Sequence, residues 1–258
     1  MKLSALVLAK NEENMIEDCL RQLDFVDEII ILDQYSKDNT ERIAKKFTDQ
    51  IIKTHETEFD KNRNLLAQAA KGEWLLYVDC DERFSRNLKK EIKEAIEKEN
   101  IAAFYIPRKN YVLGKWLRYG GFWPDYVPKL FKKVRLEGWQ GTIHESPIFR
   151  GESSKLINPV EHLTAGNLNK MLKKTIAWAR IEAELAYKAN HPRVNKFRVI
   201  KTFVGEFIYR YILKFGLLDG VQGLAQAIFQ GYHRSIMLVY LWELQNSTQE
   251  KFKPTRNV

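Results

Sequence analysis

The chain has 258 residues, 45% of them hydrophobic, so it can bury a sizeable core, and general disorder is excluded. Its two cysteines, Cys19 and Cys80, lack partners at CxxC or zinc-site spacing, which argues against a disulfide framework or structural zinc and fits a reducing compartment. Most of the net charge of +9 comes from residues 151–258, which carry 16 basic and 8 acidic side chains and should therefore meet an anionic partner.

The first hundred residues alternate between strand and helix patterns. The apolar start MKLSALVLAKNEE ends in charged residues rather than a cleavage site, so we expect a first strand and not a signal peptide. Strands separated by helices predict βαβ units and a mostly parallel sheet. The predicted strands are 3–9, 28–33, 50–54 and 74–79, and the predicted helices are 13–23, 39–47, 61–70 and 86–97.

From residue 101 the pattern changes. Aromatic residues punctuated by Gly and Pro predict extended segments and loops, and the chain becomes helical after NPVEHLTAGN. No run of about 18 uncharged apolar residues occurs, so no transmembrane helix is expected. We therefore expect an α/β domain, residues 1–165, followed by a basic helical appendage, residues 166–258.

A cluster of acids follows the apolar run WLLYV. Asp79, Asp81 and Glu82 lie within four residues, and such a cluster is costly to desolvate unless a cation neutralises it. Ligands collect at the carboxyl ends of parallel strands, so these acids predict a Mn²⁺ or Mg²⁺ site shared with a substrate phosphate. The alternative is a helix N-cap formed by Asp81 or Ser85.

A second predicted strand also ends in an acid. Asp33 precedes the Ser/Asn/Thr-rich turn QYSKDNT, an arrangement typical of a nucleotide site. The chain has no GxGxxG or P-loop motif, which disfavours a dinucleotide cofactor or a P-loop NTPase. Phosphates would instead be held by the metal and by cations such as Arg63.

Four ordered motifs carry a family resemblance. LVLAKNEE, DQYSKDNT, KNRNLLAQAAKGEW and LLYVDCDER resemble the nucleotide-binding half of family 2 glycosyltransferases, which have the GT-A fold. YIPRKNYVLGKW, GGFWPDYVPKLF and the following His-Glu pair resemble the bacterial branch that includes lipopolysaccharide-core β-glucosyltransferases. The resemblance covers residues 2–185.

The resemblance implies roles for single residues. Asp79 and Asp81 match the DxD pair, with Asp81 expected to touch the metal and His162 a candidate third ligand. Many members have Asp and Gly where this chain has Gln34 and Tyr35, although the Gln34 amide could still pair with a base edge. The residues assigned to the nucleotide sugar are Leu8, Ala9, Glu12, Asp33, Gln34, Arg63, Asp79 and Cys80.

An inverting transferase needs a base to take the proton of the acceptor hydroxyl. Glu145, at the end of WQGTIHE, is the first choice, with His144 as donor to the diphosphate or partner of the base. Asp125 in WPDY is the rival. Trp123 is a candidate to stack on the acceptor sugar, although a tryptophan can equally be a core residue.

Two C-terminal segments, 199–215 and 221–244, have helical spacing and narrow polar stripes. Helices this apolar need burial, in a core, against a second subunit or in a membrane interface. Between residues 170 and 214 basic side chains outnumber acids 11 to 3, which favours an anionic membrane surface.

The sequence thus predicts a metal-dependent inverting glycosyltransferase. It would move a sugar from a nucleotide sugar, a UDP-hexose, to a hydroxyl of a lipid-linked or lipopolysaccharide-type acceptor. We expect a cytoplasmic protein, peripheral on the inner face of the cell membrane, with no nucleic-acid partner. Homo-oligomerisation stays open. The alternatives are a nucleotidyltransferase and a non-catalytic basic membrane-binding module with a vestigial site.

Overall fold

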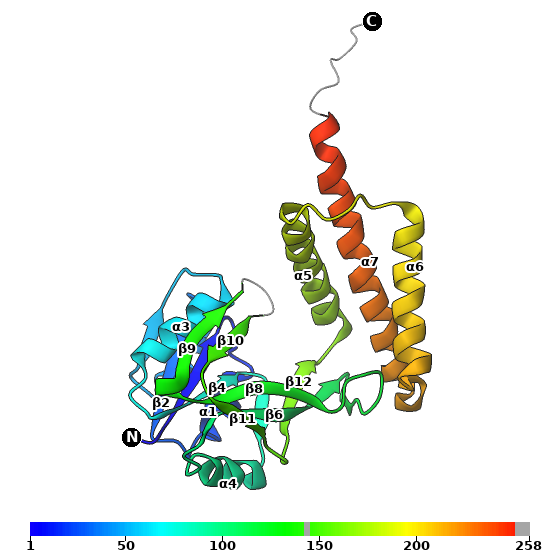
Figure 1. The fold of residues 1–258 in the computed structure, drawn as a ribbon. Helices are drawn as coiled ribbons and strands as arrows, with labels where there is room; N and C mark the ends of the chain where they lie inside the picture. The colour runs from blue at the N-terminus through cyan, green and yellow to red at the C-terminus, as the bar shows by residue number, and fades with distance from the viewer. Residues whose placement is uncertain (142–144, 251–258) are drawn as a thin grey trace, which may run out of the picture. The chain divides into compact units, whose positions relative to one another are not determined.

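The structure is a computed structural model and describes residues 1–141 and 145–250. It contains two compact units (Figure 1). The N-terminal unit comprises Met1–Asn110 and Pro124–Leu163, and the C-terminal unit comprises Tyr111–Trp123 and the chain from Thr164 onward. The segment Tyr111–Trp123 therefore groups with the C-terminal helices, while the domain division near residue 165 stays a prediction.

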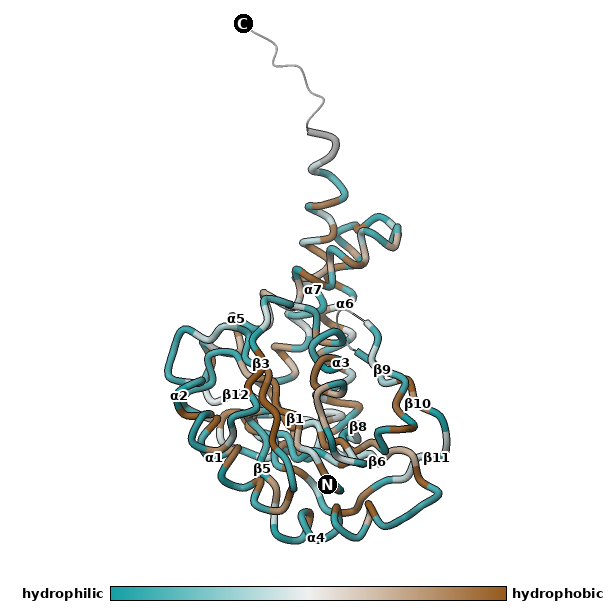
Figure 2. The backbone as a smooth tube through the Cα atoms, turned by 90° about the vertical axis from the view of Figure 1, so that its left-hand side faces the viewer, coloured by the Kyte–Doolittle hydropathy of each residue, from teal (hydrophilic) through white to brown (hydrophobic). Residues whose placement is uncertain are grey.

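Half of the main sheet is parallel. Its strands β3 (Ile51–Lys53), β2 (Glu28–Asp33), β1 (Leu3–Ala9) and β4 (Trp74–Asp79) lie in that order. The helices α1 (Ile16–Arg21), α2 (Thr40–Ala44) and α3 (Phe59–Ala69) connect them. Much of this part of the sheet is brown, for hydrophobic, in Figure 2, and the apolar runs of β1 and β4 are buried, as is typical of strands covered on both faces.

The other half of the sheet is largely antiparallel. β8 (Asp125–Lys132) pairs with β4, and β6 (Ile101–Val112), β12 (Val160–Ala165) and β5 (Glu82–Phe84) follow, with β11 (Glu152–Lys155) parallel to β6. β9 (Leu136–Gln140) and β10 (Ser146–Phe149) form a separate hairpin, and a 3₁₀ turn, η1 (Lys133–Arg135), precedes it. The predicted extended segments after residue 101 are thus strands, and the α/β class with C-terminal helices is confirmed.

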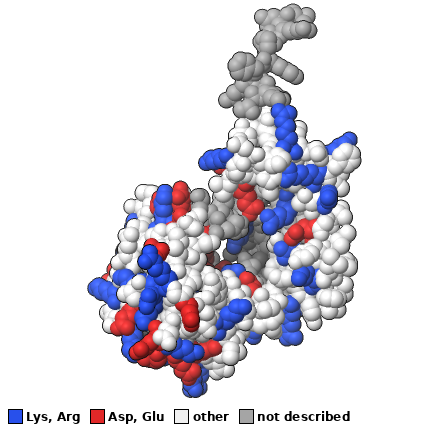
Figure 3. Space-filling view, viewed as in Figure 1, with Lys and Arg blue, Asp and Glu red and all other residues white. Residues whose placement is uncertain are grey.

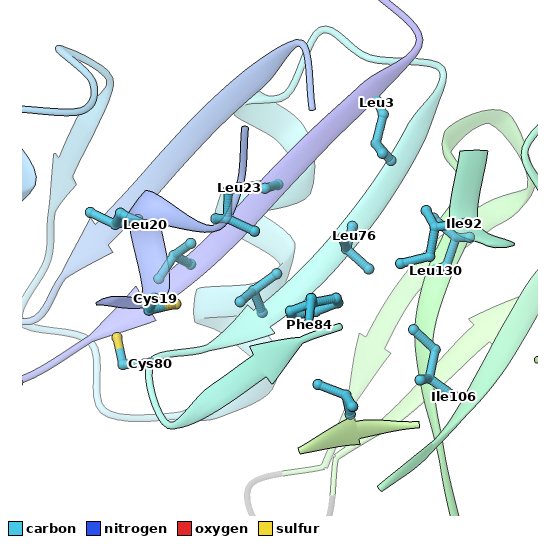
Figure 4. Close-up of a cluster of buried hydrophobic side chains, with 14 of the residues drawn as sticks. Leu3, Cys19, Leu20, Leu23, Leu76, Cys80, Phe84, Ile92, Ile106 and Leu130 are labelled. Carbon is cyan, nitrogen blue, oxygen red and sulfur yellow. The ribbon is translucent and has the colours of Figure 1, made fainter. Parts of the chain in front are cut away.

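The larger core fills the face of the sheet covered by α1, α2 and α4 (Arg86–Ala95). Leu3, Leu76 and Leu130 come from the strands, and Leu20 and Ile92 come from the helices (Figure 4). Both cysteines lie in this core as free thiols. A second core with Tyr77, Phe131 and Trp139 packs under α3 on the opposite face. The sheet is therefore fixed from both sides, which makes its strand ends a rigid support.

The C-terminal unit contains three long helices: α5 (Leu168–Lys188), α6 (Lys196–Ile208) and α7 (Val221–Glu250). A π-helical turn, η2 (Tyr209–Leu213), and a 3₁₀ turn, η3 (Gly216–Asp219), join α6 to α7, and β7 (Lys115–Trp116) pairs with the end of β6. α7 packs against both α5 and α6. In the described ranges, no helix is long and apolar enough to cross a membrane.

Candidate active site

The carboxyl ends of three parallel strands meet at one edge of the sheet. Ala9 of β1 is paired with Asp33 of β2, and Leu8 of β1 is paired with Asp79 of β4. The two carboxylates predicted at strand ends therefore flank the end of β1. This edge is where ligands bind in open α/β sheets.

Two loops beyond this edge are tied together by hydrogen bonds. The Asn11 N–H donates to Ser36 Oγ at 2.8 Å, and the Glu12 N–H donates to Thr40 Oγ1 at 2.7 Å. Ser36 Oγ in turn donates to Asp33 Oδ1 at 2.5 Å. Asp33 is only 1% exposed, so this hydrogen bond anchors the loop that contains Ser36 to a buried carboxylate. The two loops at the predicted nucleoside site are thus held together by hydrogen bonds.

Gln34 and Tyr35 follow Asp33 in the same loop. Gln34 Nε2 donates to the carbonyl oxygen of Glu56 at 2.8 Å, which holds a third loop against the site. Tyr35 has a φ of 50°, a strained value for a non-glycine residue, and stacks on His55 with ring centroids 3.9 Å apart. Because Tyr35 is 46% exposed, the stack presents an open aromatic face that the sequence did not predict.

Lys129 of β8 neutralises two of the three acids that follow β4. Its Nζ donates to Asp79 Oδ2 at 2.6 Å and to Glu82 Oε2 at 2.8 Å, and Lys129 itself is 4% exposed. Burial raises the pKa of Glu82, which is fully enclosed. Burial would also raise the pKa of Asp79, but Lys129 and Arg63 outweigh it and hold that pKa well below the ordinary value. Lys129 and Arg63 therefore neutralise much of the negative charge of the acid cluster.

Arg63 of α3 links the DxD motif to the predicted base. Its Nε donates to Glu145 Oε1 at 2.9 Å, and its Nη2 lies 3.7 Å from Asp79 Oδ1. The guanidinium lies over the rings of Trp139 and Tyr77, 4.7 and 5.3 Å from their centroids. Trp139 is thus a buried support for Arg63.

Asp81, the third acid, faces a histidine. His162 Nε2 lies 3.3 Å from Asp81 Oδ2, and His162 Nδ1 lies 2.7 Å from Asn110 Oδ1. The N-cap of α4 is Ser85, whose Oγ accepts from the Leu88 N–H at 3.2 Å, so Asp81 does not serve as the cap. The Asp81 carboxylate therefore lies next to the His162 ring, and the metal role of this pair stays a prediction.

The residues fit a divalent cation that is shared with a substrate. In the part of the chain that the structure describes, no group of three or more His, Cys, Asp or Glu side chains is arranged to hold a metal. Asp81 and His162 supply one carboxylate and one imidazole, while Asp79 is committed to Lys129 and Arg63. One or two protein ligands completed by phosphate oxygens and water are typical of a metal held together with a nucleotide.

The other predicted residues are placed as follows. Asp125 Oδ2 accepts hydrogen bonds from Arg108 Nε and from Asn110 Nδ2, each at 2.9 Å. Neither bond involves Arg63 or Glu145. His144 lies outside the described residues. Trp123 stacks edge-on against Trp116 within the C-terminal unit, with ring centroids 5.3 Å apart.

Cys80, between the two DxD acids, is a packing residue. Its thiol donates to the carbonyl oxygen of Leu8 at 3.5 Å and is 4% exposed. The hydrogen bond with Cys19 and burial raise the pKa of the Cys80 thiol well above its usual range, so it is not a nucleophile. It ties β4 to the end of β1.

The comparisons with known proteins identify the family. Residues 4–157 match the family described as glycosyl transferase family 2. The chain belongs to glycosyl transferase family 2. An uncharacterised glycosyltransferase of Rickettsia prowazekii is 22% identical over 268 residues, covering 96% of this chain and 89% of the relative. One of Rickettsia bellii is 28% identical over 263 residues, covering 94% and 87%. The solved structure of S. aureus TarS 1-349 is 14% identical, with a TM-score of 0.45 over 99% of this chain and 93% of that one.

Membership of family 2 identifies the chain as a glycosyltransferase with the predicted GT-A fold. It favours this enzyme class over a nucleotidyltransferase or a non-catalytic module. The finer assignment to the lipopolysaccharide-core branch stays a prediction.

Two functional candidates were missed from the sequence. Lys129, within the predicted extended segment DYVPKLF, is the partner of the acids. Asn110 was not singled out at all. For Lys129 a signal existed, because a lysine inside an apolar strand must be paired when it is buried.

Proposed function

We propose that this chain transfers a sugar from a UDP-hexose to a hydroxyl of a lipid-linked or lipopolysaccharide-type acceptor, with inversion and with a divalent metal. The observation that carries the proposal is the grouping of Asp81 and His162 with two buried cations, Arg63 and Lys129, beside the carboxyl ends of β1 and β4. Carboxylate, imidazole and cations at one strand edge suit a diphosphate. The choice of UDP rests on the sequence resemblance.

The proposed chemistry is a single displacement. Glu145 takes the proton of the acceptor hydroxyl as its oxygen attacks the anomeric carbon from the face opposite the diphosphate. The bond between the anomeric carbon and the diphosphate oxygen breaks, and the configuration inverts. A metal bound by Asp81 and His162 would supply charge neutralisation at the leaving diphosphate. His144 stays a candidate donor to that group.

Arg63 acts on both partners in this scheme. Its guanidinium lies between Asp79 and Glu145, so it holds the base in place and puts positive charge where the diphosphate develops negative charge. Stacking on Trp139 fixes the guanidinium plane. We favour Glu145 over Asp125 as the base because Arg63 links Glu145 to the DxD acid Asp79, whereas Asp125 contacts Arg108 and Asn110.

A membrane-bound acceptor is supported by the inverted polarity of α6. The polar pair Glu206 and Arg210 is only 21% and 20% exposed, and Arg210 Nη1 donates to the carbonyl oxygen of Gly120 at 3.0 Å. The opposite face is apolar and open: its exposed residues are Phe197 at 72%, Ile200 at 62%, Val204 at 45% and Ile208 at 44%. Their spacing of three and four residues forms one stripe.

The stripe continues past the helix and is bordered by positive charge. Leu213, Phe215, Leu218 and Val221 are each more than half exposed, and Lys196, Lys201 and Lys214 are exposed beside them. On the face drawn in Figure 3 blue side chains outnumber red ones on the C-terminal unit. An open apolar stripe with basic borders suits an anionic lipid surface, which we propose as its partner at the inner face of the cell membrane.

The proposed activity can be tested with purified full-length chain. UDP-glucose, UDP-galactose and UDP-GlcNAc are each added with Mn²⁺ or Mg²⁺, and thermal stability and UDP release are measured. A bound donor should raise the melting temperature by linkage. Asp81→Asn should remove the metal-dependent part of that rise, whereas Asp24→Asn, at an exposed acid paired with Lys89, should not. A rise of equal size in chelator would contradict the metal.

A further inference from the structure

Asn110 lies between the rival base and the candidate metal ligand. It is 5% exposed, its Nδ2 donates to Asp125 Oδ2 at 2.9 Å, and its Oδ1 is 2.7 Å from His162 Nδ1. Arg108 closes the far end, with Nε and Nη2 at 2.9 and 2.8 Å from the same Asp125 oxygen. Together with Asp81 these residues form a continuous chain of contacts across β8, β6, β12 and the turn after β4.

The chemistry of this chain of contacts fixes the direction of each hydrogen bond. Paired with Arg108, the Asp125 carboxylate only accepts, so the amide nitrogen of Asn110 must face it. The amide oxygen of Asn110 then faces His162, and because that oxygen only accepts, His162 Nδ1 must carry the hydrogen. The lone pair of a neutral His162 is left on Nε2, which faces Asp81.

The contact between His162 and Asp81, at the end of this series of hydrogen bonds, needs a cation. His162 Nε2 and Asp81 Oδ2 are 3.3 Å apart, and both are acceptors when the imidazole is neutral. Such a pair is favourable only when a proton or a metal ion lies between them. An imidazole whose Nδ1–H is held by an oxygen acceptor is also the usual form of a histidine that ligates a metal through Nε2.

We propose that Asn110 and Asp125 are positioning residues that hold His162 as its Nδ1–H tautomer, with the Nε2 lone pair directed at Asp81. This inference rests on the proposed function only for the identity of the cation, a divalent metal shared with the donor diphosphate. In this arrangement Asp125, the rival base, instead orients Asn110.

The tautomer is tested without any metal or substrate. The chain has five histidines, and ¹⁵N NMR of the metal-free protein distinguishes protonated from unprotonated ring nitrogens. The signal of His162 is identified by its loss in His162→Gln. The pH is raised until the His162 signals are those of a neutral imidazole, and the wild type should then show Nδ1 protonated and Nε2 bare. A neutral Nε2–H tautomer in the wild type would overturn the proposal.

Variants of the relay formed by Asp125, Asn110 and His162 give a second test. Asn110→Ala should release His162 into a mixture of tautomers, and Asp125→Asn should do so in part. The matched control is Asn158→Ala, which removes an asparagine amide that also donates to a carboxylate, Glu91 Oε2 at 2.8 Å on α4. The control should leave the His162 spectrum unchanged. An Asn110→Ala protein that is folded and keeps the wild-type His162 signals would also refute the relay.

Metal affinity separates this proposal from the proposed function. Mn²⁺ is titrated into the protein, alone and with UDP, and free Mn²⁺ is measured by EPR. Loss of an outer hydrogen-bond partner typically costs about 10-fold to 100-fold in metal affinity, so the Mn²⁺ Kd should rise by that factor in Asn110→Ala and stay within about twofold in Asn158→Ala. An unchanged Kd in Asn110→Ala would contradict the relay. If the wild type binds no Mn²⁺, the metal in the proposed function fails, while the tautomer still decides the relay.

Discussion

Replacing Lys129 with methionine tests whether the protein's own cation holds the acid cluster together. Lys129 is 4% exposed, and its Nζ lies 2.6 Å from Asp79 Oδ2 and 2.8 Å from Glu82 Oε2. Methionine keeps the length of the side chain and removes its charge. Without Lys129 the fully buried Glu82 loses its cation, while Asp79, whose side chain is 32% exposed, keeps Arg63 at 3.7 Å, so Glu82 is the acid that must take up a proton.

The magnitude follows from the cost of that proton. A glutamate with an unfolded pKa of about 4.3 that is forced to be neutral at pH 7.5 loses about 1.4 kcal/mol per pH unit, or about 4 kcal/mol. Breaking a buried ion pair typically costs about 3–5 kcal/mol, so we expect a loss of about 3–4 kcal/mol at pH 7.5. Burial raises the pKa of Glu82 and Lys129 lowers it, so without Lys129 the folded state binds the proton more strongly. The loss should therefore shrink as pH falls, to about 1 kcal/mol at pH 5.

Urea-dependent hydrogen exchange of peptides from β1 and β4 measures the N-terminal unit separately from the helices. Lys129→Met with Glu82→Gln should regain most of the lost stability, because no uncompensated charge remains at residue 82. Lys2→Met is the control, since its partner Glu97 and Lys2 itself are 62% and 59% exposed, and no measurable loss is expected. A loss in Lys129→Met that is below about 1 kcal/mol at pH 7.5, or is the same at pH 5, would refute the reasoning.

Three further predictions concern activity and location. Glu145→Gln should lower turnover by about 10² or more while the donor Kd stays within about twofold, because a base acts in the transition state; a collapse of donor binding would make Glu145 a ligand instead. EDTA or Asp81→Ala should abolish sugar transfer with the fold retained by circular dichroism, and full turnover in chelator would exclude the metal. Ile200→Ser with Val204→Ser should weaken binding to vesicles containing phosphatidylglycerol without lowering the melting temperature, since both side chains are open to solvent. High salt should release part of the wild-type protein from the same vesicles. Wild-type vesicle affinity in this variant, or self-association through the same face, would contradict the membrane partner.

The acids of the site were predictable because their placement is local. Asp33 and Asp79 each end a strand whose apolar run is visible in the sequence, and parallel pairing with β1 then brings the strand ends together. The strand at residues 3–9 and those at 28–33 and 74–79 have the predicted bounds. Three of the four helices are shorter than predicted, α1 by five residues, because helical periodicity extends into the flanking turns, whereas α3 is one residue longer than predicted.

The partners of these acids were not predictable, because they come from the antiparallel half of the sheet. Lys129 reaches Asp79 from 50 positions away, and Asn110 reaches His162 from 52. Their positions depend on the order β4, β8, β6, β12, which strand propensity does not encode. The prediction that a metal neutralises the acids was therefore incomplete. The sequence shows the acids, but it does not show which lysine or arginine side chains lie next to them in the fold.

The two acids of the DxD motif have different partners. Asp79 contacts Lys129 and Arg63, and it accepts no hydrogen bond from His162 in the described contacts. Asp81 contacts His162, whose ring is oriented by Asn110. Loss of the charge at residue 79 should therefore first break the ion pairs with Lys129 and Arg63. Loss of the charge at residue 81 should first remove a predicted metal ligand. The two acids of one DxD motif are thus expected to differ in kind: substitution of Asp79 should change stability as well as activity, and substitution of Asp81 should change metal and donor binding with stability retained.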